Sequence, residues 1–499
     1  MVDVMPKFTH KISYYDGDAG LAFSDVYLKP AYSDIRSRFG KQIDTSTFLA
    51  KGAPKLNIPF ISAGMDTVTE EGMAAIFALN GGIGEIHRNN TPDEQADMVR
   101  LVKERMRLIE KYPPTVSENA TIADALNLLS KRNRGYVIVF QGNAFDGHFS
   151  GIATSRDFLA NDSDTQITEV MTPFSRGRIS KLITAPFGTT LTEAVKIMRA
   201  KKIEKLPVIK DDNTLFGVYS LKDFDYINKY SNAALDKEGR LIVGAAIGVH
   251  GIDIERAHKV VNEGADVLFL DIAHGHTVYS SEMIKRLKVK EHINSPIVVG
   301  NFATKEGVLF AYDIGADGIK VGIGPGFVCK TRNIAGTGVP QVTAILEAQE
   351  ALSKKSDPPP ITADGGVREP GDPPKAIACG ADCVMWGSVW AGTEMSPGEV
   401  VKTGGRLQKR IRGMASRSVF EDRKKMGDST TNPELYTPEG REIFTPYQGS
   451  TQMILNEYIG GLRSAMSYTG SHSIKELQKA KLIHISVNGS NEQERSLNI

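Results

Sequence analysis

The sequence predicts an α/β protein built around a (β/α)8 barrel, the fold also called a TIM barrel. From about residue 240 onward, short apolar runs rich in β-branched residues alternate with helical segments, and several of these segments close on Gly-Ala-Asp. Continuous apolar strands that alternate with helices are typical of parallel strands buried on both faces. Eight such runs occur, which favours a closed barrel over an open sheet.

The runs occur in two groups along the chain. They span residues 55–69, 81–90, 240–248, 265–276, 295–304, 316–326, 359–367 and 381–392. An open doubly wound sheet would place a Gly-x-Gly-x-x-Gly turn after its first strand. Here the glycine-rich turn, with Gly322, Gly324 and Gly326, comes late in the chain, so the barrel remains the better interpretation.

An internal repeat separates the two groups. Residues 120–159 parallel residues 189–225, and each copy reads as a helix, two strands and a Ser/Thr-x-x-Asp turn. The turns run from Thr154 to Asp157 and from Ser220 to Asp223. A repeated unit of this size indicates two pieces that bury their apolar faces against each other.

This repeat resembles a pair of cystathionine-β-synthase-type (CBS) domains. The resemblance implies a regulatory module that binds ATP or GTP, with Thr154, Asp157, Ser220 and Asp223 as nucleotide-binding residues. The alternative is that the two aspartates only cap helices through backbone amides. We therefore expect a barrel formed by residues 1–112 and 233–499, with a tandem CBS domain inserted at 113–232.

The amino-acid composition limits which macromolecules the chain is expected to bind and where it is expected to be located. Lys+Arg 60 against Asp+Glu 59 gives a formal net charge of +1, so no global field draws the chain to nucleic acid or to anionic membranes. We find no signal-peptide layout and no apolar run of about 18 residues, and the chain does not end in Ser-Lys-Leu. Three cysteines are too few for a disulfide framework, which favours a reducing, cytoplasmic location.

One glycine-rich loop carries the strongest chemical signal. The segment VGIGPGFVCKTRNIAGTGVPQ (321–341) follows a predicted strand and places Cys329 where barrel enzymes have their active sites. Lys330 and Arg332 flank this cysteine and could stabilise a thiolate. An arbitrary cysteine is more often an inert buried residue, and we keep that interpretation for Cys379 and Cys383.

Six ordered segments resemble the inosine-monophosphate dehydrogenase / guanosine-monophosphate reductase family. They are MDTVTEEGMA (65–74), GIGPGFVCKTR (322–332), ADGGV (363–367), MWGSVWAG (385–392), RGMAS (412–416) and GGLRSAMSYTG (460–470). The resemblance implies that Cys329 attacks C2 of the purine of a nucleoside monophosphate bound in the barrel. It also implies a homotetramer or octamer.

The segment after RGMAS favours the reductase. Dehydrogenases of the family use an Arg-Tyr pair on a mobile flap to activate water, and no Arg-Tyr dipeptide lies between Gly413 and Gly460. TPEGREIFTPYQG (437–449) resembles the reductase flap instead, and maps a proton relay to the leaving amine onto Glu439 and Thr331. We expect a GMP reductase that uses NADPH to form IMP. The alternatives are an IMP dehydrogenase that uses NAD and a nucleotide-binding regulator without catalysis.

The same resemblance assigns binding residues. It implies that Asp364 binds the ribose, that Gly365, Gly366, Gly387 and Ser388 bind the phosphate, that Met414, Ala415, Gly440 and Arg441 bind substrate, and that Asp271, Asn301 and Arg88 bind the cofactor. His274 and His276 lack a suitable carboxylate partner, so we expect no metal site from side chains. A monovalent cation such as K⁺ could lie near the carbonyls of Gly324 and Gly326.

Three residues depart from the family pattern. Phe327 replaces a serine of the loop and Ile411 replaces the dehydrogenase tyrosine before RGM, and both family residues help to hold phosphate. The altered phosphate site is expected to rely more on Ser388 and on backbone amides. Arg88 replaces a reductase lysine, which keeps the positive charge but changes its geometry.

Overall fold

The structure is a computed structural model that describes residues 12–13, 19–105, 109–110, 113–132, 135–142, 148–159, 161–175, 182–222, 224, 229–426, 436–486 and 489. The chain forms two compact units. Unit 1 comprises Met1–Arg105 and Asn232–Ile499, and unit 2 comprises Met106–Ser231.

Unit 1 contains a closed barrel of eight parallel strands, which confirms the predicted (β/α)8 fold. In spatial order the strands are β14 (Gly244–Ile247), β15 (Val267–Asp271), β16 (Ile297–Phe302), β17 (Gly318–Val321), β18 (Ile361–Asp364), β19 (Cys383–Trp386), β5 (Phe60–Ser62) and β6 (Ile83–Ile86). Each strand lies within one of the apolar runs of the sequence. β5 and β6 close the ring by pairing with β19 and β14.

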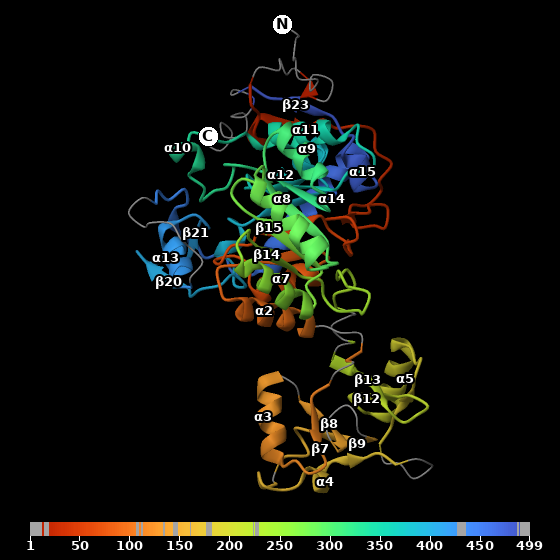
Figure 1. Ribbon diagram of the computed structural model, residues 1–499. Coiled ribbons are helices and arrows are strands. Elements are labelled where there is room, and N and C mark those ends of the chain that lie inside the picture. The colour runs from red at the N-terminus through yellow and green to blue at the C-terminus, as the bar shows by residue number, and fades with distance from the viewer. Residues whose placement is uncertain are drawn as a thin grey trace. The chain divides into compact units, whose positions relative to one another are not determined.

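Helices surround these strands (Figure 1). They are α1 (Glu71–Leu79), α2 (Pro92–Arg105), α7 (Ile252–Asn262), α8 (Val278–Lys285) with the π-helical turn η3 (Arg286–Lys290), α9 (Lys305–Asp313), α11 (Gln341–Leu352), α12 (Asp372–Cys379) and α14 (Thr451–Thr469). The short helix α10 (Thr331–Ile334) lies between β17 and α11.

The Gly-Ala-Asp sequences close three of the barrel units. They follow α7, α9 and α12, and in each the glycine has a positive φ, at 101°, 82° and 123°. Glycine reaches this left-handed region without strain, which makes it common after helices. The aspartate accepts a hydrogen bond from a backbone N–H at the start of the preceding strand: Asp266 from Val243 (2.8 Å), Asp317 from Ile297 (2.8 Å) and Asp382 from Ile361 (2.9 Å).

Aromatic side chains fill the space between barrel and helices. Both tryptophans, Trp386 and Trp390, are buried, with ring centroids 5.0 Å apart. Phe60 packs edge-on against Trp386 at 5.2 Å, and Tyr458 of α14 lies 5.1 Å from the same ring. Burial raises the pKa of Tyr458, whose hydroxyl donates to the carbonyl of Arg368 at 2.8 Å. This packing fixes α14 against the end of β19.

Smaller elements complete unit 1. The sheet β20 (Val401–Thr403), β21 (Arg406–Arg412) and β22 (Glu442–Pro446) is antiparallel, and α13 (Arg417–Lys425) follows β21. A second sheet has the order β1 (Ile12–Ser13), β23 (Leu482–His484) and β2 (Val26–Leu28). The remaining elements are β3 (Thr47–Phe48), β4 (Lys55–Leu56), α15 (Ile474–Leu477) and the 3-10 turns η2 (Phe23–Asp25) and η4 (Trp390–Gly392).

Unit 2 is built from two pieces with the same order of elements. The first is β7 (Thr115–Ser117), α3 (Ile122–Arg132), β8 (Tyr136–Gln141) and β9 (His148–Thr154), and the second is β11 (Ala185–Pro186), α5 (Leu191–Lys201), β12 (Lys205–Ile209) and β13 (Leu215–Ser220). In both, the first strand pairs parallel with the second, and the second pairs antiparallel with the third. α4 (Ile167–Val170) and β10 (Thr172–Pro173) follow the first piece.

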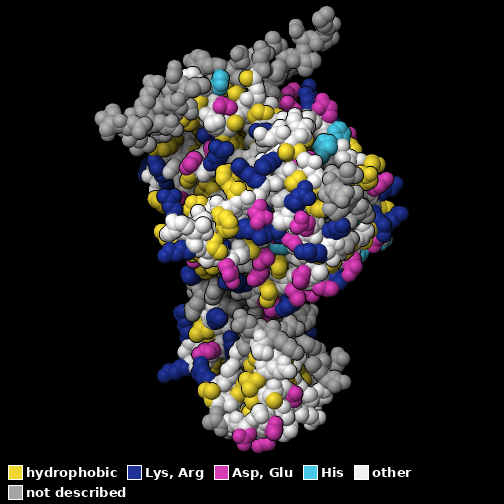
Figure 2. Space-filling model, turned by 90° about the vertical axis from the view of Figure 1, so that its left-hand side faces the viewer, with side chains coloured by type: hydrophobic (Ala, Val, Ile, Leu, Met, Phe, Trp, Pro, Cys, Tyr) yellow, Lys and Arg dark blue, Asp and Glu magenta, His cyan; other side chains and the backbone are white. Residues whose placement is uncertain are grey.

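Acidic and basic side chains are interspersed over the face of unit 1 in Figure 2, in keeping with the balanced composition. Within the part of the chain that the structure describes, no helix has the length and apolar character that a membrane crossing requires.

Candidate active site

A cavity of about 310 Å³ lies at the carboxyl ends of the barrel strands. Asp271 and Asp364 are the last residues of β15 and β18, Asn301 lies near the end of β16, and Arg88 follows β6. Barrel enzymes place their catalytic groups at this end of the strands. The cavity is therefore the candidate active site, and Cys329 lines its wall.

Cys329, Thr331 and Glu439 form a continuous hydrogen-bonded chain. The Cys329 Sγ donates to Thr331 Oγ1 at 3.2 Å, and the Thr331 hydroxyl donates to Glu439 Oε2 at 2.8 Å. Cys329 lies in the loop after β17 and Thr331 begins α10, whereas Glu439 lies 108 residues beyond Thr331 in sequence. This arrangement can carry a proton from the thiol to the carboxylate and back.

Backbone hydrogen bonds hold the segment around Glu439 against the cysteine loop. Lys330 N donates to the Glu439 carbonyl at 2.6 Å, and Arg441 N donates to the Val328 carbonyl at 2.9 Å. On the other side, Gly440 N donates to the Ala415 carbonyl at 3.0 Å. A Cβ at Gly440 would lie 2.7 Å from the Ser416 nitrogen, so a larger residue cannot approach this closely. Residues 439–441 thus form a strip between the cysteine loop and the loop at Ala415.

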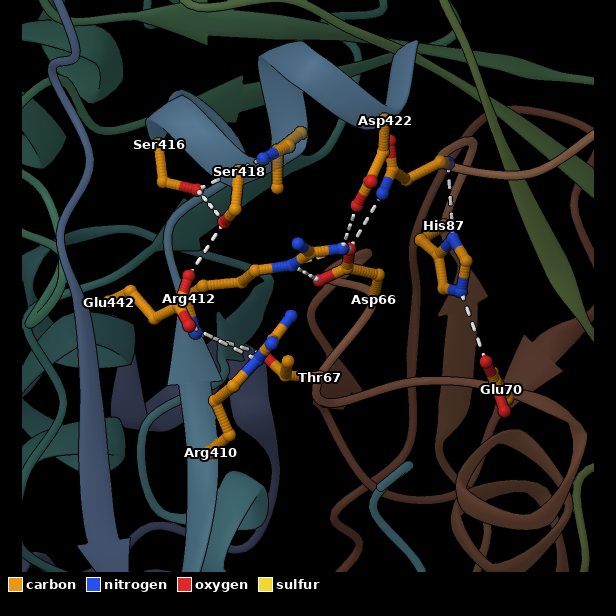
Figure 3. A network of polar contacts seen from close by, with 12 residues as sticks. Asp66, Thr67, Glu70, His87, Arg410, Arg412, Ser416, Ser418, Asp422 and Glu442 are labelled. Carbon is orange, nitrogen blue, oxygen red and sulfur yellow. Dashed lines mark hydrogen bonds and ion pairs between the residues drawn. The ribbon is translucent and has the colours of Figure 1, made fainter. Parts of the chain in front are cut away.

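Arg412 anchors the loop that contains Ala415 and Ser416. Its Nε donates to Asp66 Oδ2 at 3.0 Å, and its Nη2 lies 2.9 Å from Asp422 Oδ2 of α13 (Figure 3). The backbone N–H of Arg412 donates to the Thr67 hydroxyl at 3.2 Å. Burial lowers the pKa of Arg412, but Asp66 and Asp422 raise it overall. This ion-pair network ties β21 and α13 to the loop after β5.

A buried lysine lies beneath the cavity. Lys320 of β17 is 2% exposed, and its Nζ lies 2.6 Å from Asp271 Oδ1, 3.4 Å from Asp364 Oδ2 and 3.8 Å from Glu85 Oε2. Burial opposes the charge of Lys320, but the three carboxyl groups raise its pKa. Burial would raise the pKa of Asp271, and Lys320 lowers it instead. The ammonium therefore holds two carboxylates in the floor of the site.

Glu85 of β6 differs from the other two acids. It is fully buried, and neither carboxyl oxygen has a hydrogen-bond partner among the described residues. Burial raises the pKa of Glu85 well above its ordinary value, against the opposing charge of Lys320. Gly64 makes room for this side chain, because a Cβ there would lie 2.7 Å from Glu85 Oε1.

A second cavity, of about 490 Å³, shares Cys329 and the Gly324–Pro325–Gly326 turn with the first. Ser388 lies after β19 on its wall, and Phe327 lies in the cysteine loop. Three arginines also line it: Arg332, Arg368 and Arg441. The two cavities meet at the cysteine.

The structure brings most of the sequence-assigned residues to these two cavities. The first is lined by Cys329, Thr331, Glu439, Asp364, Gly365, Met414, Ala415, Gly440, Asp271, Asn301 and Arg88, and the second by Cys329, Ser388 and Arg441. Gly366 and Gly387 line neither cavity; a Cβ at Gly387 would lie 2.7 Å from the Met65 sulfur. Asn301 donates to Asp364 Oδ2 at 2.8 Å and to the Gly322 carbonyl at 2.7 Å.

The residues assigned to regulatory nucleotide binding lie in unit 2. Asp157 Oδ2 accepts hydrogen bonds from Thr154 N at 2.7 Å and from Thr154 Oγ1 at 2.9 Å, which is a local cap. Ser220 accepts from Lys205 Nζ at 2.6 Å. Asp223 lies outside the described residues.

Sequence reasoning missed Lys320 and Glu85. A usable signal was present, because each is a charged residue inside a strand that is otherwise apolar and buried on both faces, in GIKV and IGEI. Such a residue needs a partner. Arg368 was also not assigned to the site, and Arg332 was considered only as a neighbour that could stabilise the Cys329 thiolate.

The residues Cys379, Cys383, His274 and His276 line neither cavity. Cys379 ends α12 and Cys383 begins β19, both buried, as the sequence suggested, and burial raises the pKa of Cys383. His274 and His276 have ring centroids 6.3 Å apart. No group of three or more His, Cys, Asp or Glu side chains among the described residues could hold a metal ion.

Comparisons with known proteins identify the family of the chain. The family model described as "IMP dehydrogenase / GMP reductase domain" matches residues 20–495. An inosine-5′-monophosphate dehydrogenase from Nitrosopumilus maritimus is 40% identical over 480 residues, which cover 95% of this chain and 98% of the relative. One from Staphylococcus aureus strain MW2 is 43% identical over 465 residues, 92% of each chain.

Solved structures extend the comparison. A variant GMP reductase from Trypanosoma brucei in complex with guanosine 5′-monophosphate matches with a TM-score of 0.86 and 35% identity, covering 95% of this chain and 97% of that one. A GMP reductase from the same organism in complex with guanosine 5′-triphosphate matches with a TM-score of 0.75 and 32% identity, covering 94% and 98%. The chain therefore belongs to the IMP dehydrogenase / GMP reductase family of oxidoreductases of purine metabolism.

Proposed function

We propose that the protein is an NADPH-dependent GMP reductase, which converts GMP to IMP and ammonia through a covalent bond between Cys329 and the purine. The observation that supports this most directly is the chain from Cys329 through Thr331 to Glu439, at 3.2 Å and 2.8 Å. It supplies both a nucleophile and a route for the proton that the departing amine needs.

The residues divide the chemistry as follows. The Cys329 proton moves through the Thr331 hydroxyl to Glu439, and the resulting thiolate adds to C2 of the purine. The same route returns a proton to the 2-amino nitrogen, the C–N bond breaks, and ammonia leaves. C2 then remains bonded to sulfur as a thioimidate. A reduced nicotinamide, held by Asn301, Asp271 and Arg88, would supply a hydride to C2; the C–S bond would then break and sulfur would leave with its electron pair.

The floor of the site fits a nucleotide and a nicotinamide. Asp364 carries the carboxylate assigned to the ribose hydroxyls, and Lys320 keeps that group oriented through its contact at 3.4 Å. Asn301 Oδ1 is buried and has no hydrogen-bond partner among the described residues. This acceptor suits the N–H of a carboxamide, so we assign Asn301, Asp271 and Arg88 to the cofactor.

IMP dehydrogenase is the second candidate. The dehydrogenases named above are 40% and 43% identical to the chain, and this identity favours oxidation of IMP by NAD⁺. Hydrolysis must then follow, and the Arg-Tyr pair that dehydrogenases use for it is missing between Gly413 and Gly460. We therefore place the reductase first.

One absorbance experiment separates the two. GMP with NADPH should lower the absorbance at 340 nm and release ammonia, whereas IMP with NAD⁺ should give negligible sustained xanthosine monophosphate. Cys329→Ala is the control, because it should bind GMP yet lose turnover by several orders of magnitude. Sustained oxidation of IMP at a rate comparable to GMP reduction would assign the dehydrogenase activity instead.

We extend the proposal to unit 2. We assign it as a tandem CBS module in which ATP or GTP, bound near Thr154, Asp157, Ser220 and Asp223, shifts the activity of a cytoplasmic homotetramer or octamer. A nucleotide there acts by binding two states of the assembly with different affinity. K⁺ at the carbonyls of Gly324 and Gly326 is a further expectation, tested by replacing K⁺ with Na⁺ in the assay.

A further inference from the structure

The second cavity has an unusual balance of charge. Its described lining includes Arg332, Arg368 and Arg441 and no Asp or Glu. Within the described part of the chain, no carboxylate forms an ion pair with any of the three. Cations gathered at one wall repel each other unless an anion joins them. This balance of charge favours an anionic ligand in the cavity, which Cys329 also lines.

Arg441 is the best oriented of the three. The Phe327 carbonyl accepts hydrogen bonds from both Nε (3.0 Å) and Nη2, and the guanidinium carbon lies 5.0 Å from the centre of the Phe327 ring. A guanidinium has five N–H donors, so three remain free for a ligand. Arg441 also follows Glu439 by two residues, on the strip that is bonded to Val328 and Lys330.

In the family, the residues at positions 327 and 411 help to hold phosphate through hydroxyl groups. Neither residue of this chain has a hydroxyl group. Phe327 is 43% exposed and contributes a ring and a carbonyl. Ile411 is 1% exposed and paired with Ile443 inside the sheet. Ser388 and Thr445 are the hydroxyl-bearing side chains on the described cavity wall. A hydroxyl carries no charge to offset that of a dianionic phosphate, whereas a guanidinium does so and matches the phosphate geometry with two parallel hydrogen bonds.

We propose that Arg441 binds the 5′-phosphate of the nucleotide, with Phe327 as the platform that orients the guanidinium. This inference rests on the proposed nucleotide substrate. Since Arg441 and Glu439 belong to one strip, the phosphate also holds the relay carboxylate beside Thr331. Part of the free energy of phosphate binding should then raise kcat, in addition to the part that raises the affinity for the nucleotide.

The test compares ligands with and without a phosphate. Binding of GMP and guanosine, and of IMP and inosine, is measured by calorimetry in the Cys329→Ala background, where no turnover interferes. Arg441→Met should lower the preference for nucleotide over nucleoside by roughly 10- to 100-fold, the worth of a charge-assisted hydrogen bond. Arg441→Lys should lose less, because it keeps the charge.

Two controls make the result specific. Arg410→Met removes a neighbouring arginine that pairs with Glu442 at 3.4 Å and lines neither cavity, and it should leave the preference unchanged. Phe327→Ser added to Arg441→Met restores the family hydroxyl and should recover part of the preference. Thermal melting of each variant confirms that it folds.

The outcomes separate this inference from the proposed function. An equal loss of nucleotide and nucleoside affinity in Arg441→Met, or an unchanged preference, overturns the role of Arg441 even when GMP remains the substrate. Failure of every purine nucleotide to bind to Cys329→Ala overturns the proposed function itself. With active enzyme, a fall in kcat of Arg441→Met for GMP but not for guanosine supports the link to Glu439.

Discussion

Among the described residues, the hydroxyl of Thr331 links the Cys329 thiol to the Glu439 carboxylate, so its removal tests the relay directly. Thr331→Val keeps the branched shape of the side chain and deletes the oxygen that accepts from Sγ at 3.2 Å and donates to Oε2 at 2.8 Å. Backbone hydrogen bonds still hold the two loops together, through Lys330 and Arg441. The variant should therefore fold and bind GMP as the wild type does.

The expected loss follows from the step that the relay serves. A positioned acid or base contributes roughly 10²–10⁴ to a rate, which corresponds to about 3–5 kcal/mol of barrier. The loss should fall on the release of ammonia, because only that step needs a proton on nitrogen. Glu439→Gln should show a similar loss. The double variant should lose little more than either single one, as for groups that act as a unit.

A single-turnover experiment separates the steps. Rapid mixing of enzyme, GMP and NADPH, with quenching, follows ammonia release and the decay of absorbance at 340 nm in the same sample. Deuterium in the transferred position of NADPH provides a second readout, because its isotope effect disappears once departure of the amine limits the rate.

Three results would contradict a proton-carrying role for the Thr331 hydroxyl. Ammonia release within about threefold of wild type in Thr331→Val would show that the hydroxyl carries no proton. A loss confined to hydride transfer would place the group in another step. A collapse of GMP affinity with unchanged kcat would make Thr331 a binding residue.

Three further predictions concern stability and regulation. Burial raises the pKa of Glu85, so this carboxyl group keeps its proton to higher pH in the folded state than in the unfolded chain. The free energy of unfolding should therefore fall as pH rises above about 4.5. Glu85→Gln should flatten that decline in urea titrations at several pH values. Lys103 Nζ lies 2.6 Å from Asp266 and 3.0 Å from Asp236. Lys103→Met should cost about 3–5 kcal/mol in urea unfolding at pH 7, because it leaves Asp266 buried without its cation, whereas a cost below about 1 kcal/mol would contradict this. Asp157→Ala should weaken any effect of ATP or GTP on the initial rate, while turnover without these nucleotides should stay nearly unchanged. A nucleotide response that survives the substitution would contradict the regulatory role of Asp157.

Much of the fold could be predicted because the barrel repeats one local pattern. Each strand is an apolar run buried on both faces, and turns such as those at Asp266, Asp317 and Asp382 recur after helices, so local sequence carries the signal. Glu439 and Thr331 could be assigned from short motifs, although 108 residues separate them. The physical basis of their pairing is the strip of backbone hydrogen bonds, which no local pattern reveals.

The residues that were missed depend on three-dimensional juxtaposition. Lys320 is stabilised by carboxyl groups on three other strands, and a charged residue inside an apolar run looks locally like an exception to the pattern. Arg332 and Arg368 are distant in sequence and reach one cavity, together with the sequence-assigned Arg441, only after the barrel closes. The loss of hydroxyls at 327 and 411 was visible in the sequence, but the guanidinium beside Phe327 was not.

The hydrogen bonds between the cysteine loop and the strip around Glu439 also constrain how the site can open. Lys330 N and Arg441 N donate across the same short antiparallel junction, in which Cys329 pairs with Gly440. A segment held in this way leaves its neighbour in a cooperative step, because the bonds are lost together. In the proposed mechanism, the nucleophile and the acid are then assembled or separated as one element, and a ligand that stabilises this junction stabilises both loops. A site with a reactive thiolate but no acid to protonate the departing amine would then be rarely populated.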